Sequence, residues 1–500
     1  MHNAQMKKII YQLLAVTIII WLVWLPLSTS GNLRMDSDRM LFHPEEALSQ
    51  YVQEGRFGLV LLLNLFGLTS WNPVLSGLLF LAFFTLSLWL LCFFIFHFTK
   101  GNRKFPYALF ALILGTCPTW AFHIYFVLQI AAIGFGLFLT VLLAGMDAHF
   151  HLHQKKLSWP LILYELCSLL LLSFSLSIYQ GLIVYYLAAA AIFFFCHILR
   201  DHSLQLRRVL WWGIRVLLSL GFYLCASYLI AGGTSSYLSQ QIQWGQLPVL
   251  QCLMNIAIQF GKSVVFLHSA CVSLYPLAIA LFIVLLIHQW KEHPGQTKRN
   301  LLLLLAGMAI VLLPMAMSVL QGSRPVPRTQ FGLQVAAAFL PAIFLALSPG
   351  KNIFVRALCV LVVCLQIVLN IRLIHTDNVR NQADLQTANM ITTHLKDTSF
   401  SEKPLIFFGS LSFHDDSVFL EKTDVYGRSF FEWIYEENNP SSATTSAVRL
   451  LRACDATNYQ ACKDASLIKQ AVDLACSLPA FPQEGYILER EQYILIKLSE

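Results

Sequence analysis

The first 374 residues of this 500-residue chain contain very few acidic residues, nine in all. The whole chain is 57% hydrophobic and 12% charged, with a mean hydropathy of +0.63. This composition is typical of a polytopic membrane protein and excludes a soluble multidomain protein. Five of the nine acids lie between residues 31 and 72, so we expect chemistry in that segment. These five are Asp36, Asp38, Glu45, Glu46 and Glu54.

Long apolar runs of about 20 residues fit the hydrocarbon core of a bilayer. Cys117-Pro118 interrupts one apolar region, and the alternative for 105–146 is one helix with a broken or re-entrant piece. The expected fold is an all-α polytopic membrane protein with a small C-terminal α/β domain. The sequence predicts about eleven membrane-spanning helices, at 9–30, 73–98, 105–121, 123–146, 158–177, 181–199, 209–231, 269–290, 300–320, 331–348 and 353–372.

The predicted domain boundary follows the last apolar run. Residues 1–374 form the membrane module, whose first outer loop is 31–72, and residues 375–500 form a soluble α/β domain. We expect the first helix to be a retained anchor, and the nearly uncharged connection 232–268 to be amphipathic or re-entrant. The periodicity of the tail predicts a helix at 377–397, a strand at 405–409, helices near 442–454 and 465–477, and a hairpin of 486–488 with 493–498.

Basic residues alternate between the predicted loops. Lys7 and Lys8 precede the first helix, and every second loop after it is basic. This pattern predicts a multi-pass protein of the cell membrane with a cytoplasmic N-terminus and an extracytoplasmic C-terminus. Residues 1–374 carry a net charge of +14 and residues 375–500 a net charge of −7. The basic excess orients the chain, and no basic patch interleaved with aromatic residues indicates a nucleic-acid partner.

The twelve cysteines have no metal-ligand spacing. Cys454, Cys462 and Cys476 lie in the predicted outer tail, where one disulfide and free thiols are both compatible with the sequence. There is no Asp-rich metal cage either. We therefore expect no cofactor and a reaction that is independent of metal.

Asp36 and Asp38 are the candidate catalytic residues. In an extended chain they point to the same side, roughly 6–7 Å apart, whereas in a helix they diverge. A carboxylate just outside a membrane can deprotonate a sugar hydroxyl that attacks an activated anomeric carbon. We favour one working base, because a donor with a good leaving group needs no separate acid. The alternative is a solvated, helix-capping or ion-paired acid.

Arg324 and Arg328 lie in the predicted short outer loop 321–330, against the orientation rule. Two guanidinium groups there suit a lipid-linked phosphate, which they bind bidentately, while Pro325 and Pro327 stiffen the loop. The alternatives are anchoring to lipid headgroups and pairing with the first loop. Tyr179 and Gln180 form a very short outer turn and either reach a sugar hydroxyl or cap helix ends.

Three further residues stand out by their expected depth in the membrane. His123 and His268 are predicted at the outer face, and Glu165 is the one carboxylate predicted well inside a span. A single intramembrane acid is weak support for a proton-coupled carrier.

Several short motifs are spread over nearly the full chain. They are Asp36-Ser37-Asp38-Arg39, EGRFG at 54–58, SIYQG at 177–181, the loop 321–330, GRSFFEW at 427–433 and FPQEGYILEREQYILIKLS at 481–499. Together they resemble membrane glycosyltransferases of the GT-C superfamily. The closer resemblance is to the glucosyltransferase type II family, the serotype-converting O-antigen glucosyltransferases and their relatives.

The resemblance implies transfer of glucose or a similar hexose from a polyprenyl-phosphate donor to a cell-envelope glycan, outside the membrane and with inversion. The family's first-loop acid maps onto Asp36, with Asp38 the alternative because the adjacent DD pair is missing here. Arg324 and Arg328 would hold the donor phosphate. The candidate substrate-binding residues are Arg39, Arg56, Tyr179 and Gln180. A polysaccharide polymerase or ligase, and a lipid-linked sugar transporter or flippase, are the alternative functions.

Overall fold

A computed structural model describes the chain except for residues 1, 35, 103, 154–158, 202–205, 233–240, 265–274, 349–351, 398–402, 413–426, 456 and 500. The chain divides into two compact units that do not follow sequence order. The helical unit comprises Met1–Thr29 and Leu48–Asn370, and the C-terminal unit comprises Ser30–Ala47 and Ile371–Glu500. Part of the first loop therefore belongs to the same unit as the tail. Helix α3 (Pro44–Gln53) and helix α18 (Ile353–Asp397) contribute residues to both units.

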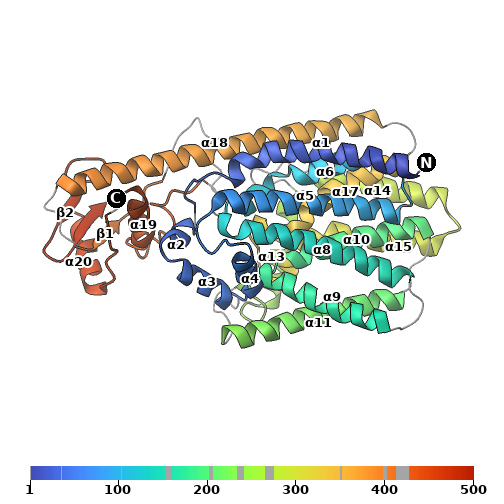
Figure 1. The fold of residues 1–500 in the computed structure, drawn as a ribbon, viewed down its shortest axis with the longest axis horizontal. Helices are drawn as coiled ribbons and strands as arrows, with labels where there is room; N and C mark the ends of the chain where they lie inside the picture. The colour runs from blue at the N-terminus through green and yellow to red at the C-terminus, as the bar shows by residue number, and fades with distance from the viewer. Residues whose placement is uncertain are drawn as a thin grey trace. The chain divides into compact units, whose positions relative to one another are not determined.

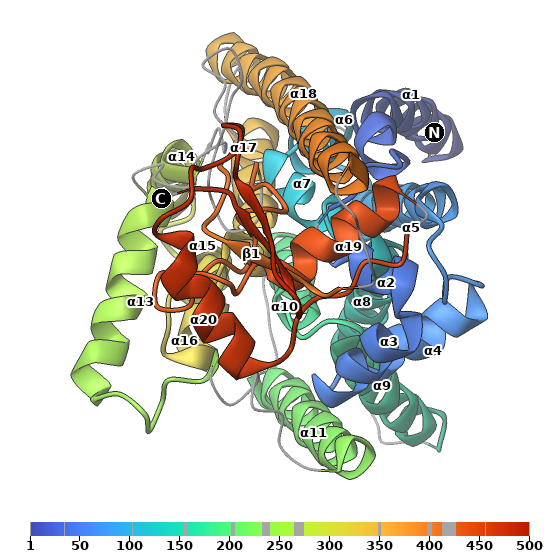
Figure 2. The ribbon, with the colours of Figure 1, turned by 90° about the vertical axis from the view of Figure 1, so that its left-hand side faces the viewer.

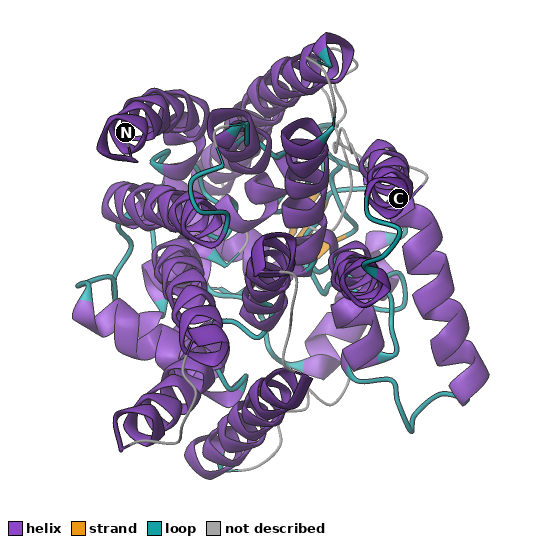
Figure 3. Ribbon diagram, turned by 90° about the vertical axis from the view of Figure 1, so that its right-hand side faces the viewer, coloured by secondary structure: helices purple, strands orange, loops and turns teal. Residues whose placement is uncertain are grey.

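The helical unit is a bundle of long apolar helices (Figures 1 and 3). Helix α5 packs along α8, α8 packs against α10, α9 packs against α11, and α14 packs against α17. The helices are α1 (His2–Ser28), α4 (Phe57–Leu65), α5 (Pro73–Phe98), α6 (Tyr107–Gly115), α7 (Ala121–Ile124), α8 (Val127–His153), α9 (Trp159–Ile178), α10 (Leu182–Asp201), α11 (Leu206–Ala231), α13 (Val249–Val264), α14 (Tyr275–Glu292), α15 (Thr297–Leu312), α16 (Ala316–Gln321) and α17 (Phe331–Leu347), with 3-10 turns η1 (Pro118–Trp120), η2 (Leu313–Met315) and η3 (Pro327–Thr329).

The protein is a multi-pass membrane protein. Within the described residues, eight helices are long and apolar enough to cross a bilayer, or nine if Tyr107–Gly115 and Pro118–Ile124 form one broken span, bent by 42°. The alternative for 105–146, one helix with a broken piece, is therefore the one that the structure shows, because the break falls at Cys117-Pro118 and the single helix α8 follows. Each of the eleven predicted ranges overlaps a helix, but α17 is short and α14 ends in the polar run 288–292. With the broken pair counted as one span, these two helices account for the difference between nine and eleven, and residues 269–274 of the predicted range 269–290 lie outside the described residues.

The two long connections, 31–72 and 232–268, both contain helices, and the helix in the second is amphipathic, as the sequence predicted. Helix α3 begins at Pro44, where the missing N–H and the fixed φ of proline suit the first helical position. Its apolar residue Tyr51 is buried. In the second connection, α13 is amphipathic, with Val249 and Leu253 exposed and Cys252 and Gln259 buried. An exposed apolar face suits a helix in contact with lipid.

The C-terminal unit has the predicted α/β composition. Its sheet has the order β1-β3-β2, with β1 (Leu405–Phe408) parallel to β3 (Ile494–Lys497) and β2 (Ile487–Glu489) antiparallel to it. The hairpin pairs Ile487 with Ile496. Helices α19 (Thr444–Cys454) and α20 (Ala465–Ala475) both contact the sheet (Figure 2). The predicted strand, helices and hairpin are thus confirmed.

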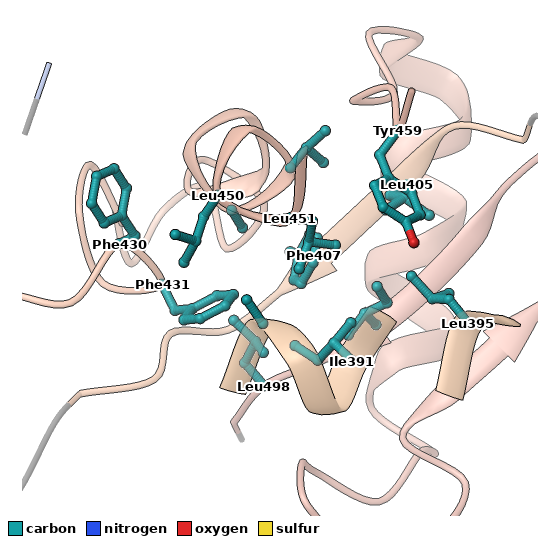
Figure 4. Packing of buried hydrophobic residues seen from close by; sticks show 14 of the residues in the cluster. Ile391, Leu395, Leu405, Phe407, Phe430, Phe431, Leu450, Leu451, Tyr459 and Leu498 are labelled. Atoms are coloured by element: carbon teal, nitrogen blue, oxygen red, sulfur yellow. The ribbon is translucent and has the colours of Figure 1, made fainter. Parts of the chain in front are cut away.

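The sheet separates two hydrophobic clusters, because alternate residues of a strand point to opposite faces. On one face, Leu405 and Phe407 pack with Ile391 and Leu395 of α18 and Leu451 of α19 (Figure 4). On the other face, Ile406 and Leu495 pack against α20. The polar helix predicted at 377–397 is the end of α18, so it continues the last apolar helix without a break.

Candidate functional site

The EGRFG and SIYQG motifs meet in the helical unit. Gly55 has a φ of 76° and ends α3, with Arg56 N–H donating to the Tyr51 carbonyl at 2.8 Å and Gly55 N–H to the Val52 carbonyl at 2.9 Å. This is a Schellman motif, in which glycine takes the left-handed position. Gly58, the second residue of α4, lies so close to α9 that a Cβ there would collide with Ser177 Oγ. Each glycine of EGRFG thus has a geometric reason.

This close approach brings three predicted substrate-binding residues together. The Arg56 guanidinium lies 5.5 Å from the centre of the Tyr179 ring. The Gln180 side-chain amide donates to the Glu54 carbonyl at 3.1 Å and to the Tyr223 hydroxyl at 2.9 Å. The turn 177–181 therefore contacts the end of α3 directly.

The charge of Arg56 is compensated. Its Nη1 lies 3.3 Å from Glu54 Oε2 and donates to Gln129 Oε1 at 3.2 Å, and both charged side chains are 11% exposed. Gln129 and Tyr223 lie inside apolar runs, so no sequence signal marked them. A neutral, hydrogen-bonding surface of this kind suits sugar hydroxyls better than a phosphate.

An aromatic group lies next to this surface and extends to Arg328. Phe331 stacks on His123 at 4.6 Å and meets Tyr179 edge to face at 6.0 Å. His123 is 1% exposed and hydrogen-bonds the backbone of Arg328, and its Nε2 has no hydrogen-bond partner within the described residues. The Arg328 guanidinium lies 4.7 Å from the centre of the Phe126 ring. Arg328 and Tyr179 are thus connected through His123.

Arg324 and His268 are the other arginine and histidine that the sequence singled out. Arg324 is in the same loop and is exposed to solvent. His268 lies outside the described residues.

The predicted acids belong to the C-terminal unit. Asp36 has a φ of 66° and is half-buried at the start of α2 (Ser37–Phe42). Asp38 is 5% exposed and its Oδ2 is 3.1 Å from Arg449 Nη1 on α19. Asp36 and Asp38 could cooperate only in an extended chain, where both would point to the same side. The segment is helical from Ser37, so it does not have that conformation. Arg39 lies half-buried on the same short helix.

A buried charge network, which sequence reasoning missed, holds this segment within its unit. Asp377 Oδ2 accepts from Arg34 Nε at 3.0 Å and from Arg34 Nη2 at 2.8 Å. Arg380 donates to Asp377 at 3.2 Å, to Asp384 at 2.8 Å and to the Leu33 carbonyl at 2.8 Å. Two arginines and two aspartates balance each other, and all four are at most 4% exposed. The network fixes the chain just before Asp36.

A second buried cluster corrects the prediction about Glu165. Helix α8 continues to His153, so Asp147 also lies within a span, and it pairs with Arg215 of α11. The same Arg215 lies 3.5 Å from Glu165. Glu165 is therefore not the one carboxylate inside a span, and a shared arginine compensates both acids. This arrangement gives no support to a proton-coupled carrier.

The three tail cysteines Cys454, Cys462 and Cys476 are free thiols. Within the described residues, no group of three His, Cys, Asp or Glu side chains could hold a metal ion. Metal independence stays a prediction.

Comparison with known families gives the class of protein. The family Glucosyl transferase GtrII matches residues 25–345, which include the segment with Asp36, both motifs and the arginine loop. No curated protein and no solved structure matches the chain. The chain belongs to the GtrII glucosyl transferase family. Membership, together with the apolar helices, implies a membrane glycosyltransferase that acts on a sugar donor and a glycan acceptor.

Proposed function

We propose that this protein transfers glucose, or a similar hexose, from a polyprenyl-phosphate donor to a cell-envelope glycan on the extracytoplasmic face. The observation that carries the proposal is the meeting of EGRFG, SIYQG and the neighbourhood of Arg328 around Tyr179 and His123. It combines a neutral polar surface with an aromatic wall and a guanidinium, which are the parts that a sugar phosphate needs.

The donor phosphate is assigned to Arg328 and Arg324. The Arg328 guanidinium lies 4.7 Å from the centre of the Phe126 ring, and a guanidinium binds phosphate oxygens bidentately through its N–H groups. Arg324, exposed in the same short loop, would add a second donor fork. Positive charge at this point stabilises the phosphate as the glycosidic bond breaks.

The hexose is assigned to the surface around Tyr179 and Gln180. The ion pair of Arg56 with Glu54 holds this surface neutral overall. The Gln180 amide and the Tyr223 hydroxyl, which are hydrogen-bonded to each other here, would exchange that bond for bonds to sugar hydroxyls. The buried His123 Nε2 is one further position at which a polar group of the substrate would gain a partner. Lipid-linked donors reach such a surface by diffusing within the bilayer.

Asp36 is assigned as the general base. Its carboxylate would take the proton of the acceptor hydroxyl, the hydroxyl oxygen would attack C1 of the hexose, and the bond from C1 to the phosphate oxygen would break with inversion. Asp38 is less suited, since it is buried against Arg449, whereas Asp36 is half-buried. The polyprenyl phosphate leaves as the anion. Arg39, next to Asp38 on the same helix, is a candidate contact for the acceptor.

A transfer assay tests the proposal. The purified protein is reconstituted into proteoliposomes and given synthetic polyprenyl-phosphate glucose whose glucose is labelled. Transfer of the label to an extract of envelope lipids is then measured. We expect Arg328→Lys and Arg324→Lys to lower kcat/KM, because lysine keeps the charge but loses the planar fork. Arg207→Lys, at an exposed arginine of α11, is the matched control and should leave the kinetics unchanged. Unchanged kinetics in both loop variants would place the phosphate site elsewhere.

A further inference from the structure

A small apolar cavity lies between α14 and α15, away from the residues assigned to sugar transfer. Its volume is about 290 Å³. Gln289, Lys291 and Asn300 are also among the lining residues, although almost all of the lining surface is apolar. The lipid-facing residues Ile287 and Leu301 nearby are about half exposed. The apolar part of its lining consists of Leu286, Ile287, Trp290, Leu303 and Leu304.

A buried guanidinium, that of Arg299, is hydrogen-bonded to two of the residues that line this cavity. Arg299 is 5% exposed, and it donates to Gln289 Oε1 at 2.9 Å and to Asn300 Oδ1 at 3.2 Å. Both acceptors are neutral amides that line the cavity, and Arg299 Nε has no hydrogen-bond partner within the described residues. The acid that acts on Arg299 electrostatically is Glu292, which is about half exposed and lies 3.1 Å from His288. A buried arginine ordinarily has an anion against it.

Other positive groups lie where α14 ends and α15 begins. Lys298 and Arg299 lie in the first turn of α15, where the partial positive charge of a helix N-terminus normally favours acids, and no acid is present there. Lys291 lies in the last turn of α14 and lines the cavity. The charge alternation of the loops predicts that this end faces the cytoplasm. That leaflet is the one richer in anionic lipids.

We infer that this cavity binds one anionic phospholipid. Its acyl chain lies between α14 and α15, and its phosphate lies against Arg299, Lys291 and the N-terminus of α15. An apolar lining next to basic residues matches a lipid with a negative headgroup, because the acyl chain fills the cavity and the headgroup meets the positive charges. A free phosphate would leave the apolar cavity empty. This site is independent of the proposed function, and its test measures no sugar transfer.

Trp290 lines the cavity, so its fluorescence reports an acyl chain there. Purified full-length protein in detergent is titrated with phosphatidylglycerol brominated on its acyl chains, and separately with phosphatidylcholine carrying the same chains. We expect stronger quenching by the anionic lipid at low concentration, and loss of this excess in Trp290→Phe. Equal quenching by the two lipids, or an excess that persists without Trp290, would overturn the site.

Charge variants test the basic end. Arg299→Gln should weaken the anionic lipid about 10- to 100-fold, the ratio expected from loss of a charge-assisted hydrogen bond. Lys291→Gln, at an exposed position with little effect on folding, should weaken it about fivefold. Arg356→Gln is the matched control, because Arg356 also lies in the first turn of a long helix but is exposed. The assignment would be contradicted if Lys291→Gln bound the anionic lipid as tightly as the native protein. It would also be contradicted if the control Arg356→Gln lost as much affinity as Arg299→Gln.

Competition identifies the occupant. Unbrominated phosphatidylglycerol should displace the probe, whereas inorganic phosphate at millimolar concentration should not. Displacement by polyprenyl phosphate at a lower concentration than by phosphatidylglycerol would overturn the phospholipid and make the cavity a site for the carrier lipid. Displacement by inorganic phosphate would show that the apolar cavity contributes nothing.

Discussion

Asp377→Asn should loosen the segment that precedes Asp36. The Asp377 carboxylate accepts from Asn32, from two nitrogens of Arg34 and from Arg380, at 2.8 to 3.2 Å. Asparagine removes the negative charge and leaves two buried arginines against one aspartate. Breaking a buried pair in this way costs about 3–5 kcal/mol. Since 1.36 kcal/mol is a factor of ten, local opening should become about 10²- to 10⁴-fold more frequent.

Amide hydrogen exchange of α2 measures this opening, because its N–H groups are protected by bonds such as His43 N–H to the Arg39 carbonyl. Asp464→Asn is the control: it makes the same substitution at an exposed cap of α20, where asparagine also caps well. The double variant Arg34→Met with Asp377→Asn should be less destabilised than Asp377→Asn alone, because one charge of each sign is gone. Unchanged exchange in Asp377→Asn, or a double variant that costs the sum of the two singles, would refute the reasoning.

Two further predictions concern thiol reactivity and orientation. Burial raises the pKa of the Cys454 thiol to about 11, so only about one thiol in a thousand is a thiolate at pH 8. Peptide mass spectrometry should therefore show the exposed Cys476 alkylated well before Cys454, and the alkylation rate of Cys454 should rise steeply above pH 9. Equal alkylation rates would contradict the burial argument. In a cysteine-free background, a membrane-impermeant reagent should label Asn438→Cys in intact cells but Lys104→Cys only after the membrane is opened, and the reverse pattern would invert the protein.

The elements of this fold could be predicted from the sequence because each depends on local pattern. Strand β1 and the β2–β3 hairpin follow from short β-branched and aromatic runs, and the break at Pro118 follows from proline itself. The continuity of α18 was harder to see. Between Arg372 and Asp397 the composition becomes polar, yet no glycine or proline interrupts the helix. The change in composition indicates where the helix leaves the apolar environment, but it does not end the helix, whose backbone hydrogen bonding continues.

The candidate site was predictable in part for the same reason. Arg56, Tyr179 and Gln180 stand in short polar interruptions of an apolar chain, and the structure brings them together. The pairing of Arg34 with Asp377, 343 positions apart, has no local signal, because a charged residue does not specify its partner. Asp147 was overlooked because its helix was predicted to end at residue 146.

The role of Asp36 is the central claim, and one comparison of rates tests it most directly. Transfer of labelled glucose from polyprenyl-phosphate glucose is measured for the native protein, Asp36→Asn and Asp38→Asn, with melting curves to establish that each variant is folded. Loss of a general base should lower the rate of Asp36→Asn by about 10²- to 10⁴-fold without a change in melting temperature. Asp38→Asn should lose less activity but more stability, since it breaks the pair with Arg449. Full activity in a folded Asp36→Asn variant would contradict the account.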